Sequence, residues 1–161
     1  MNSNKFLQLV NHPLKFRLFL LSKLPSAYFS GLRVHYANEK KCVVTVPYNR
    51  FTQNPFKSTY FACLSMAAEM STGILAMAHV YKRSPAISML VLKVEGNFIK
   101  KSTGTTHFEC LDGILIKQTI EDAIISGEGK IITARSTGRN KEGEVVADFL
   151  VTWSFKEKKK S

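Results

Sequence analysis

The segment at residues 60–78, YFACLSMAAEMSTGILAMA, consists almost entirely of apolar and small side chains. Its residue types favour a helix of about 30 Å. Its apolar positions cover most directions around the helix axis: Tyr60, Phe61, Leu64, Met66, Ala67, Met70, Ile74, Leu75 and Met77. We expect a turn at Pro55 and an N-cap at Ser58 or Thr59. A helix that is apolar on all sides has to be enclosed by the rest of the chain.

Short β-branched and aromatic runs on both sides of this segment can supply the enclosure. They are predicted as strands, in chain order, at residues 32–37, 41–48, 87–100, 104–113, 129–140 and 144–156. Short turns join the first two and the last two, so both pairs are interpreted as hairpins in a mostly antiparallel sheet. About six strands around one long helix indicate an α+β fold.

Alternation along two of these strands predicts which side chains face the helix. In the strand at 87–100, it places four apolar side chains on one face: Leu90, Leu92, Val94 and Phe98. In the last strand it places six on one face: Val145, Ala147, Phe149, Val151, Trp153 and Phe155. We expect these two rows to contribute to the core.

Helical segments are predicted in two further places. Residues 1–26 are expected to form helical turns that pack on the domain, interrupted near Pro13 and ended by Pro25. A short helix that stops at Gly127 is predicted from apolar residues at helical spacing: Ile116, Ile120, Ala123 and Ile124. No linker or repeat divides the chain, so residues 1–161 are expected to form one domain that ends in a basic tail at 156–161.

The 161 residues carry a formal net charge of +11, which indicates an anionic partner such as nucleic acid, a membrane surface or a phosphate-bearing small molecule. No helix-turn-helix signature is present, which disfavours nucleic acid. No stretch reaches the roughly 18 apolar residues of a membrane span, so none is expected. Three cysteines without a C-x-x-C pair are expected to be reduced and buried, which predicts a cytoplasmic protein. Four histidines show no metal-ligand spacing, so no metal is expected.

One acidic residue, Glu69, lies near the middle of the apolar helix, where a carboxylate is costly unless it is paired, neutralised or used. Small and polar residues share its face of the helix: Ala62, Ser65, Thr72, Gly73 and Ala76. Two interpretations stay open. Glu69 either accepts hydrogen bonds from Ser65, Thr72 or a facing strand, or it is a catalytic acid beside a ligand.

Residue spacing in this region resembles that of the hotdog thioesterases similar to the phenylacetate-degradation enzyme. In those enzymes an asparagine precedes a His-Gly-Gly by six positions, and a catalytic acid follows the histidine by nine. Asn54, Tyr60 and Glu69 keep both intervals. A later aromatic, basic and glycine pattern between two strands matches Phe98, Lys100 and Gly104 in "NFIKKSTG", and the likeness continues through "GEVVADFLVTW".

The whole chain also resembles an uncharacterised bacterial hotdog family, a domain of unknown function within the thioesterase superfamily. The stretches that carry this likeness are "NPFKSTYFA", "MAAEMSTG", "SMLVLK", "FIKKSTG" and "VTWSFK". The resemblance implies a hotdog fold, in which a curved antiparallel sheet encloses one long helix.

The resemblance further implies an acyl-CoA thioesterase. Glu69 would act as general base or nucleophile, with Asn54 and Tyr60 at the other two matching positions of the site. The backbone N–H groups of Phe61 and Ala62 would polarise the thioester carbonyl. Contacts to the substrate are expected from Ser65, Thr72, Gly73, Lys100, Lys101, Arg135 and Arg139. The enzyme would work as a homodimer, which can pair into tetramers, and would need no cofactor beyond the coenzyme A of its substrate.

Tyr60-Phe61-Ala62 stands where these enzymes have His-Gly-Gly, and this difference keeps a second function open. Phe61 adds a ring and Ala62 a methyl group where glycines let a ligand approach the backbone. A non-catalytic hotdog protein that binds an acyl chain or acyl-CoA is therefore the alternative to the enzyme.

Overall fold

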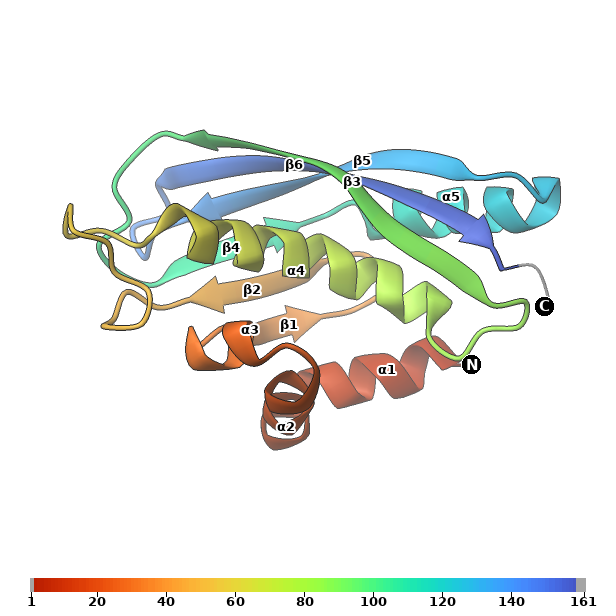
Figure 1. Ribbon diagram of the computed structural model, residues 1–161, viewed down its shortest axis with the longest axis horizontal. Helices are drawn as coiled ribbons and strands as arrows, with labels where there is room; N and C mark the ends of the chain where they lie inside the picture. The colour runs from red at the N-terminus through yellow and green to blue at the C-terminus, as the bar shows by residue number, and fades with distance from the viewer. Residues whose placement is uncertain (1, 159–161) are drawn as a thin grey trace.

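The computed structural model describes residues 2–158, and its central feature is one long helix enclosed by a sheet and flanked by shorter helices (Figure 1). The elements follow in the order α1 (Asn2–Asn11), α2 (Pro13–Lys23), α3 (Pro25–Phe29), β1 (Arg33–Ala37), β2 (Cys42–Val46), α4 (Phe61–Val80), β3 (Ile87–Phe98), β4 (Thr106–Cys110), α5 (Gly113–Ser126), β5 (Lys130–Arg139) and β6 (Val145–Glu157). The strands form one antiparallel six-stranded sheet in the order β1-β2-β4-β5-β6-β3. The predicted helix, strands and antiparallel pairing are confirmed.

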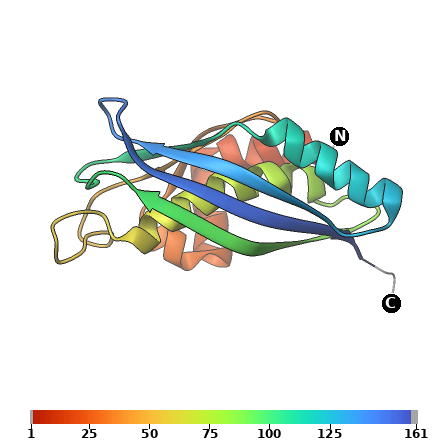
Figure 2. The same cartoon turned by 90° about the horizontal axis from the view of Figure 1, so that it is seen from above.

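The long helix α4 is buried along almost its whole length, as its apolar surface requires. Seen from above, β5, β6 and β3 pass over it (Figure 2). The core contains residues from α4 and from the inner faces of the strands, among them Leu75, Phe108, Phe149 and Phe155. Alone among the described helices, α4 is long and apolar enough to cross a membrane, but it is the core helix of this fold.

The start of α4 differs from the prediction. Its N-cap is Tyr60, whose side chain makes no capping hydrogen bond. Ser58 and Thr59 precede the N-cap position, and their hydroxyls bond to the preceding loop and to Ser102. Ser58 Oγ donates to Asn54 Oδ1 at 3.2 Å, and Thr59 Oγ1 donates to the Ser102 carbonyl at 3.2 Å.

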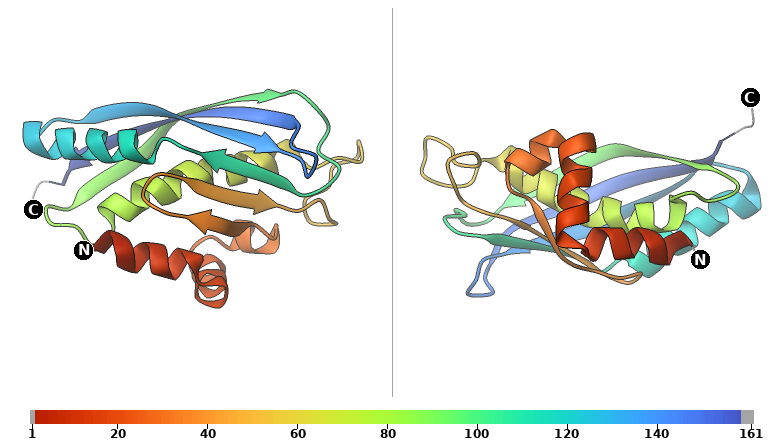
Figure 3. Two further views of the ribbon diagram at one scale, coloured as in Figure 1. Left: turned by 180° about the vertical axis from the view of Figure 1, so that it is seen from behind. Right: turned by 90° about the horizontal axis from the view of Figure 1, so that it is seen from below.

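The N-terminal segment forms three helices on the side of α4 that the sheet leaves open (Figure 3). The helical region reaches Phe29, beyond the predicted limit of residue 26, because both prolines begin helices. Pro13 and Pro25 occupy first-turn positions, where the missing N–H of proline costs nothing. A proline read as a helix stop was here the start of the next helix.

Helix α5 completes the enclosure where the sheet opens. Strands β4 and β5 pair only from His107 to Glu109, and α5 packs beside the unpaired part of β5. Its buried residues Ile116, Ile120 and Ala123 agree with the predicted spacing. Gly127 ends the helix in the left-handed conformation at φ 68°, as predicted.

The predicted core row of β3 is wrong: Leu90, Leu92, Val94 and Phe98 are all exposed and do not belong to the buried core. A bulge also prevents them from sharing one face. The register with β6 shifts between Val91 and Lys93, so Leu90 and Val94 face opposite sides of the sheet. Leu90 is opposite Ser154 on the outer face, whereas Val94 is opposite Val151 on the inner face. Alternation counted through the sequence cannot detect the extra residue.

A second bulge, in β6, shows that the predicted inner position of Val145 is wrong. Ala147 is opposite Gly138 on the inner face, but Val145 is opposite Arg139 on the outer face. The other five predicted inner residues of β6 are buried, as expected. Strand β6 runs to Glu157, so Lys156 belongs to the sheet and not to a tail, and residues 159–161 of the predicted tail lie outside the described residues.

The three cysteines are free and buried, as predicted. Cys42 and Cys110 are cross-strand partners in β2 and β4. Burial raises the pKa of the Cys110 thiol to about 12, so the thiol stays protonated at neutral pH.

Candidate functional site

Glu69 lines a cavity of about 340 Å³ between α4, the N-terminal helices and the edge of the sheet. Apart from Glu69, Gly73 and Lys23, its walls are apolar: Phe6 from α1, Phe16, Phe19 and Leu24 from the α2 region, Met70, Ile74 and Met77 from α4, Met89 from β3 and Trp153 from β6. A chamber of this composition suits an acyl chain. Among the described residues that line it, Glu69 is the only acid.

The Glu69 side chain accepts no hydrogen bond and forms no ion pair within residues 2–158. Burial raises the pKa of its carboxyl group above the ordinary value for glutamate. The interpretation in which Ser65, Thr72 or a facing strand satisfies Glu69 is therefore wrong. Ser65 Oγ donates to the Phe61 carbonyl at 2.9 Å, and Thr72 Oγ1 donates to the backbone carbonyl of Glu69 at 2.8 Å.

The absence of a side chain at Gly73 leaves space for the Glu69 carboxyl group. A Cβ at Gly73 would lie 3.2 Å from Glu69 Oε1 and 3.3 Å from Trp153 Cζ2. Gly73 thus lines the cavity, as the prediction of a substrate contact requires. Thr72 does not line it, because its hydroxyl is buried against Trp153.

A second hollow, of about 570 Å³, lies at the start of α4. It brings together five of the predicted site residues: Asn54, Tyr60, Phe61, Lys100 and Lys101. The N–H groups of Phe61 and Ala62 have no acceptor in the described part of the chain, as expected for the first turn of a helix. The Phe61 ring stands among other aromatic rings, 4.8 Å from Tyr60 and 6.3 Å from Phe98 between centroids.

Asn54 organises the loop before α4. Its Oδ1 accepts hydrogen bonds from the N–H groups of Phe56 and Ser58, at 3.0 and 3.2 Å, and from the Ser58 hydroxyl. Its Nδ2 points to the Thr59 carbonyl at 3.5 Å. These bonds occupy the amide group, so Asn54 shapes the site by holding the loop.

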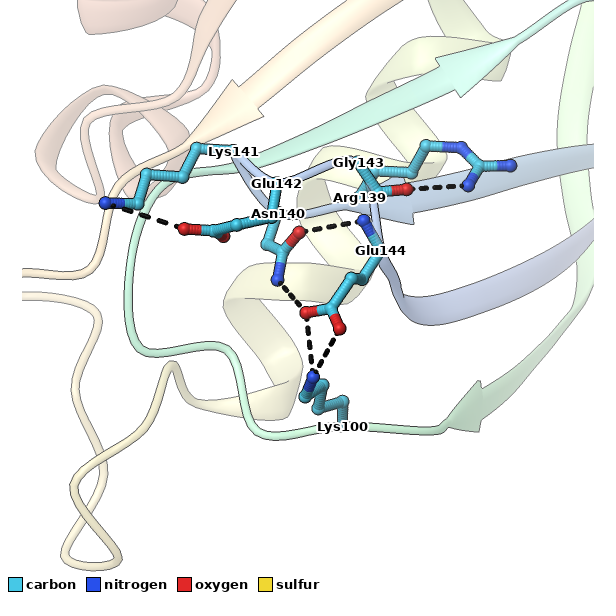
Figure 4. A network of polar contacts seen from close by, with 7 residues as sticks. All are labelled: Lys100, Arg139, Asn140, Lys141, Glu142, Gly143 and Glu144. Carbon is cyan, nitrogen blue, oxygen red and sulfur yellow. Dashed lines mark hydrogen bonds and ion pairs between the residues drawn. The ribbon is translucent and has the colours of Figure 1, made fainter.

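The predicted cations are partly engaged with other groups. Lys100 Nζ contacts both carboxylate oxygens of Glu144, at 2.8 and 2.7 Å, and Asn140 also donates to that carboxylate (Figure 4). These donors hold the pKa of Glu144 below its usual value. Lys101 Nζ lies 3.4 Å from the Phe56 carbonyl and faces the hollow at the start of α4.

Arg135 and Arg139 lie on the other side of the molecule. They occupy the outer face of β5, because Ala134, Ser136 and Gly138 take the inner positions. Arg135 Nε donates to Asp148 at 2.9 Å, and an Arg139 guanidinium N–H donates to the Gly143 carbonyl at 2.9 Å. The sheet separates both arginines from Glu69, so they do not join its cavity.

Several solved structures have the same arrangement of helix, sheet and flanking helices. A Pseudomonas aeruginosa protein of unknown function, described as a probable thioesterase, aligns with a TM-score of 0.77 at 20% identity, over 93% of this chain and 99% of its own. A protein of unknown function from Chlorobaculum tepidum aligns with a TM-score of 0.76 at 16% identity, over 97% and 94%. A thioesterase from Haemophilus influenzae aligns with a TM-score of 0.62 at 14% identity, over 87% and 88%.

The protein has the hotdog fold. No protein-family model matches the sequence, and no curated protein matches it. The likeness is therefore one of structure, and the expected fold is confirmed. It covers the N-terminal helices as well as the sheet, since the alignments with the first two structures span more than nine tenths of the chain.

Within one hotdog protomer, the acid and the helix-start amides are well separated. Glu69 follows Phe61 by eight residues on the same helix, which corresponds to about 12 Å along the axis. One carbonyl group cannot contact both. The two halves of the predicted site can meet only if a second protomer supplies one of them.

Sequence reasoning missed the outer wall of the Glu69 cavity. Phe16, Phe19 and Lys23 of α2 form part of it, together with Met89 of β3. The N-terminal segment was expected to pack on the domain, but nothing in its pattern indicates which face of α4 it covers. Six of the eight residues at 14–21 are apolar, interrupted only by Lys15 and Arg17, and this density was the one signal that the segment has two apolar sides.

Proposed function

We propose that the protein hydrolyses acyl thioesters, with Glu69 as the general base or nucleophile and the acyl chain in the adjoining cavity. The observation that carries the proposal is an acid on the wall of an apolar chamber, with no side-chain partner among residues 2–158. A raised pKa makes its carboxylate a better acceptor for the proton of an attacking water at neutral pH.

In the reaction, water attacks the thioester carbonyl carbon while Glu69 takes one of its protons. Negative charge develops on the carbonyl oxygen, where the amides of Phe61 and Ala62 from a second protomer would stabilise it. Collapse of this intermediate breaks the carbon–sulfur bond, and the thiolate recovers the proton from Glu69. Direct attack by the carboxylate would instead break the carbon–sulfur bond, release the thiolate and form a mixed anhydride, which water then hydrolyses to the free acid and the Glu69 carboxylate.

The second protomer is expected at strand β3. This strand is an edge of the sheet, twelve residues long, and its apolar residues Leu90, Leu92 and Val94 are exposed. Long exposed apolar edges pair readily with another strand. Pairing of β3 with its copy would form a homodimer and bring a second α4 near the Glu69 cavity, which supports a site shared between protomers.

Coenzyme A is the proposed carrier of the acyl group, because its phosphates match the positive charge of the chain. Lys101 faces the hollow at the start of α4, and Lys100 lies beside it in its pair with Glu144. Tyr60 borders the same hollow and can donate a hydrogen bond from its hydroxyl.

The aromatic cluster at the start of α4 favours a second candidate function. The Phe61 ring, 4.8 Å from Tyr60, lines the hollow at the start of α4, where a glycine would leave the backbone open to a ligand. A protein that binds an acyl chain or acyl-CoA without cleaving it would need the cavity but not the amides. This function would leave Glu69 as a polar contact only.

The test is release of free thiol from acyl-CoA esters of several chain lengths by wild type and by Glu69→Gln. The proposal predicts that the substitution reduces kcat by about 10²-fold or more. Glu142→Gln, at an exposed position of the β5–β6 turn, is the matched control and should keep full activity. Equal turnover by wild type and Glu69→Gln would exclude the catalytic role. Bound acyl-CoA in native mass spectrometry without hydrolysis would select the binding function.

A further inference from the structure

Helix α2 is apolar on two opposite sides but packs against the protein on only one of them. Phe16 and Leu20 are buried, whereas Leu14 and Leu18 are 72% and 68% exposed. Leu21 is also exposed, and the three leucines follow each other at spacings of four and three residues, which places them in one row. The helix α4, with a similarly apolar surface, is enclosed; α2 has no such cover among residues 2–158.

Every charged residue in the N-terminal segment around this row is basic. The first 38 residues contain Lys5, Lys15, Arg17, Lys23 and Arg33 and no acidic residue. All of these side chains except Arg17 are exposed. The Arg17 guanidinium lies over the Tyr28 ring at 3.8 Å and donates to the Tyr28 carbonyl, so this cation is held beside α2.

We propose that α2 docks the protein on an anionic membrane surface. The row Leu14, Leu18 and Leu21 would insert at the level of the lipid headgroups, and the surrounding lysines would attract anionic lipids. A helix that lies in the membrane interface combines an apolar side with basic residues in this way. The proposal concerns a surface and does not depend on the hydrolysis of thioesters.

Helix α5 shows why the proposed membrane contact depends on charge as well as on exposed apolar side chains. It also exposes three large apolar side chains, Ile114, Leu115 and Ile125. Its own charged residues are Lys117, Glu121 and Asp122, so acids outnumber bases on this helix. Glu121 is paired with Arg83 at 2.7 Å, so the surface of α5 has no excess of positive charge to attract anionic lipids. Exposed leucines or isoleucines alone would not distinguish the two helices.

The position of α2 gives the docking a consequence. Phe16 and Phe19, on the side of α2 that faces the protein, line the Glu69 cavity, and the exposed Lys23 borders it. A docked α2 would therefore separate the cavity from the membrane by the thickness of one helix. If the proposed function holds, this location favours substrates whose acyl groups come from membrane lipids. This substrate preference rests on the proposed function, whereas the docking does not.

The test is sedimentation of the full-length protein with vesicles of phosphatidylcholine, with and without about 30% phosphatidylglycerol. Wild type is expected to bind the anionic vesicles and to lose binding as salt is raised. The triple variant Leu14→Ser, Leu18→Ser, Leu21→Ser should reduce the bound fraction about ten-fold, and Lys5→Glu with Lys15→Glu should do the same. The matched control is Ile114→Ser, Leu115→Ser, Ile125→Ser on α5, which should bind as wild type does.

Three outcomes would overturn the proposal. The first is the absence of binding to anionic vesicles, and the second is an equal loss of binding in the α5 control. The third is a change from dimer to monomer in the α2 triple variant, measured by light scattering, which would make the row an interface between copies of this chain. Circular dichroism of each variant checks that it is folded.

Discussion

The indole N–H of Trp153 donates a hydrogen bond to the hydroxyl of Thr72, with 2.9 Å between Nε1 and Oγ1. The bond joins β6 to α4 inside the protein, because both side chains are buried. Thr72 in turn donates to the Glu69 carbonyl at 2.8 Å. The indole ring also forms part of the Glu69 cavity, so this bond fixes the position of one cavity wall relative to the acid.

Thr72→Val should therefore lower the free energy of unfolding by about 1–3 kcal/mol, since it leaves the Trp153 N–H buried without an acceptor. The valine keeps the shape of threonine, so packing changes little. Thr133→Val, which breaks the exposed hydroxyl contact with Thr152 at 2.9 Å, is the control and should cost less than about 0.5 kcal/mol. Urea denaturation of both variants measures the difference, and equal losses would contradict the assigned role of the buried bond.

Glu69→Gln should stabilise the protein at neutral pH. Burial raises the pKa of the Glu69 carboxyl, so the folded chain holds this proton up to a higher pH than the unfolded chain, whose glutamates titrate near about 4.3. Wild-type stability then falls as pH rises from the unfolded pKa to the folded pKa, because the native state binds more protons in that window. The gain in the free energy of unfolding of Glu69→Gln over wild type should be small at low pH and largest above the folded-state pKa of Glu69.

The measurement is the free energy of unfolding of wild type and Glu69→Gln across about pH 4 to 8. Glu142→Gln, on the exposed β5–β6 turn, controls for the loss of one negative charge. If the difference between wild type and Glu69→Gln were the same at every pH, the raised pKa would be refuted.

The proposed dimer makes β3 sensitive to charge. Leu92→Lys with Val94→Lys would place like charges opposite each other across the paired strands, and should weaken dimerisation at least about ten-fold. Ile131→Lys, at a similarly exposed position of the interior strand β5, should leave the dimer intact. Light scattering over a range of protein concentrations gives the dissociation constants. A dimer that tolerates the β3 substitutions would have to use another surface.

Gly113 at the start of α5 should not tolerate a side chain. A Cβ there would collide with the backbone carbonyl of Glu39, and the Gly113 N–H donates to the Lys40 carbonyl at 3.1 Å. Gly113→Ala is expected to destabilise the protein by about 1–3 kcal/mol, because backbone cannot move aside as a flexible side chain can. Gly104→Ala, where a Cβ meets nothing within 4 Å, should change stability by less than about 0.5 kcal/mol. Chemical denaturation of both variants checks the contrast.

Local pattern was sufficient for the elements themselves. The segment at 60–78 could only be a buried helix, and α4 extends over Phe61–Val80. The stop at Gly127 was predictable from the conformational freedom of glycine. The faces of β3 and β6 were not fully predictable, since one extra residue in a ladder reverses every later side chain and is set by the partner strand.

The candidate site divides in the same way. Glu69 could be singled out because a carboxylate among apolar residues needs a reason, and its identity as the unusual residue of the helix came from the sequence alone. The roles of its neighbours could not be read in this way. Asn54 turned out to hold its own loop, and Arg135 to lie beyond the sheet, because hydrogen-bond partners and faces depend on contacts between distant segments.

The order of residues determined that an apolar helix had to be wrapped, which strands would wrap it, and that one acid would be enclosed with it. Those properties follow from side-chain chemistry and spacing along a short stretch of chain. Only the tertiary structure decided that the acid opens on a cavity, that α2 forms the cavity's outer wall, and that the leucines of α2 remain uncovered. These depend on where the N-terminal helices lie relative to α4: α1 contacts α4 directly, and α2 faces it across the cavity. Contacts between segments so distant along the chain leave no periodic trace in the sequence.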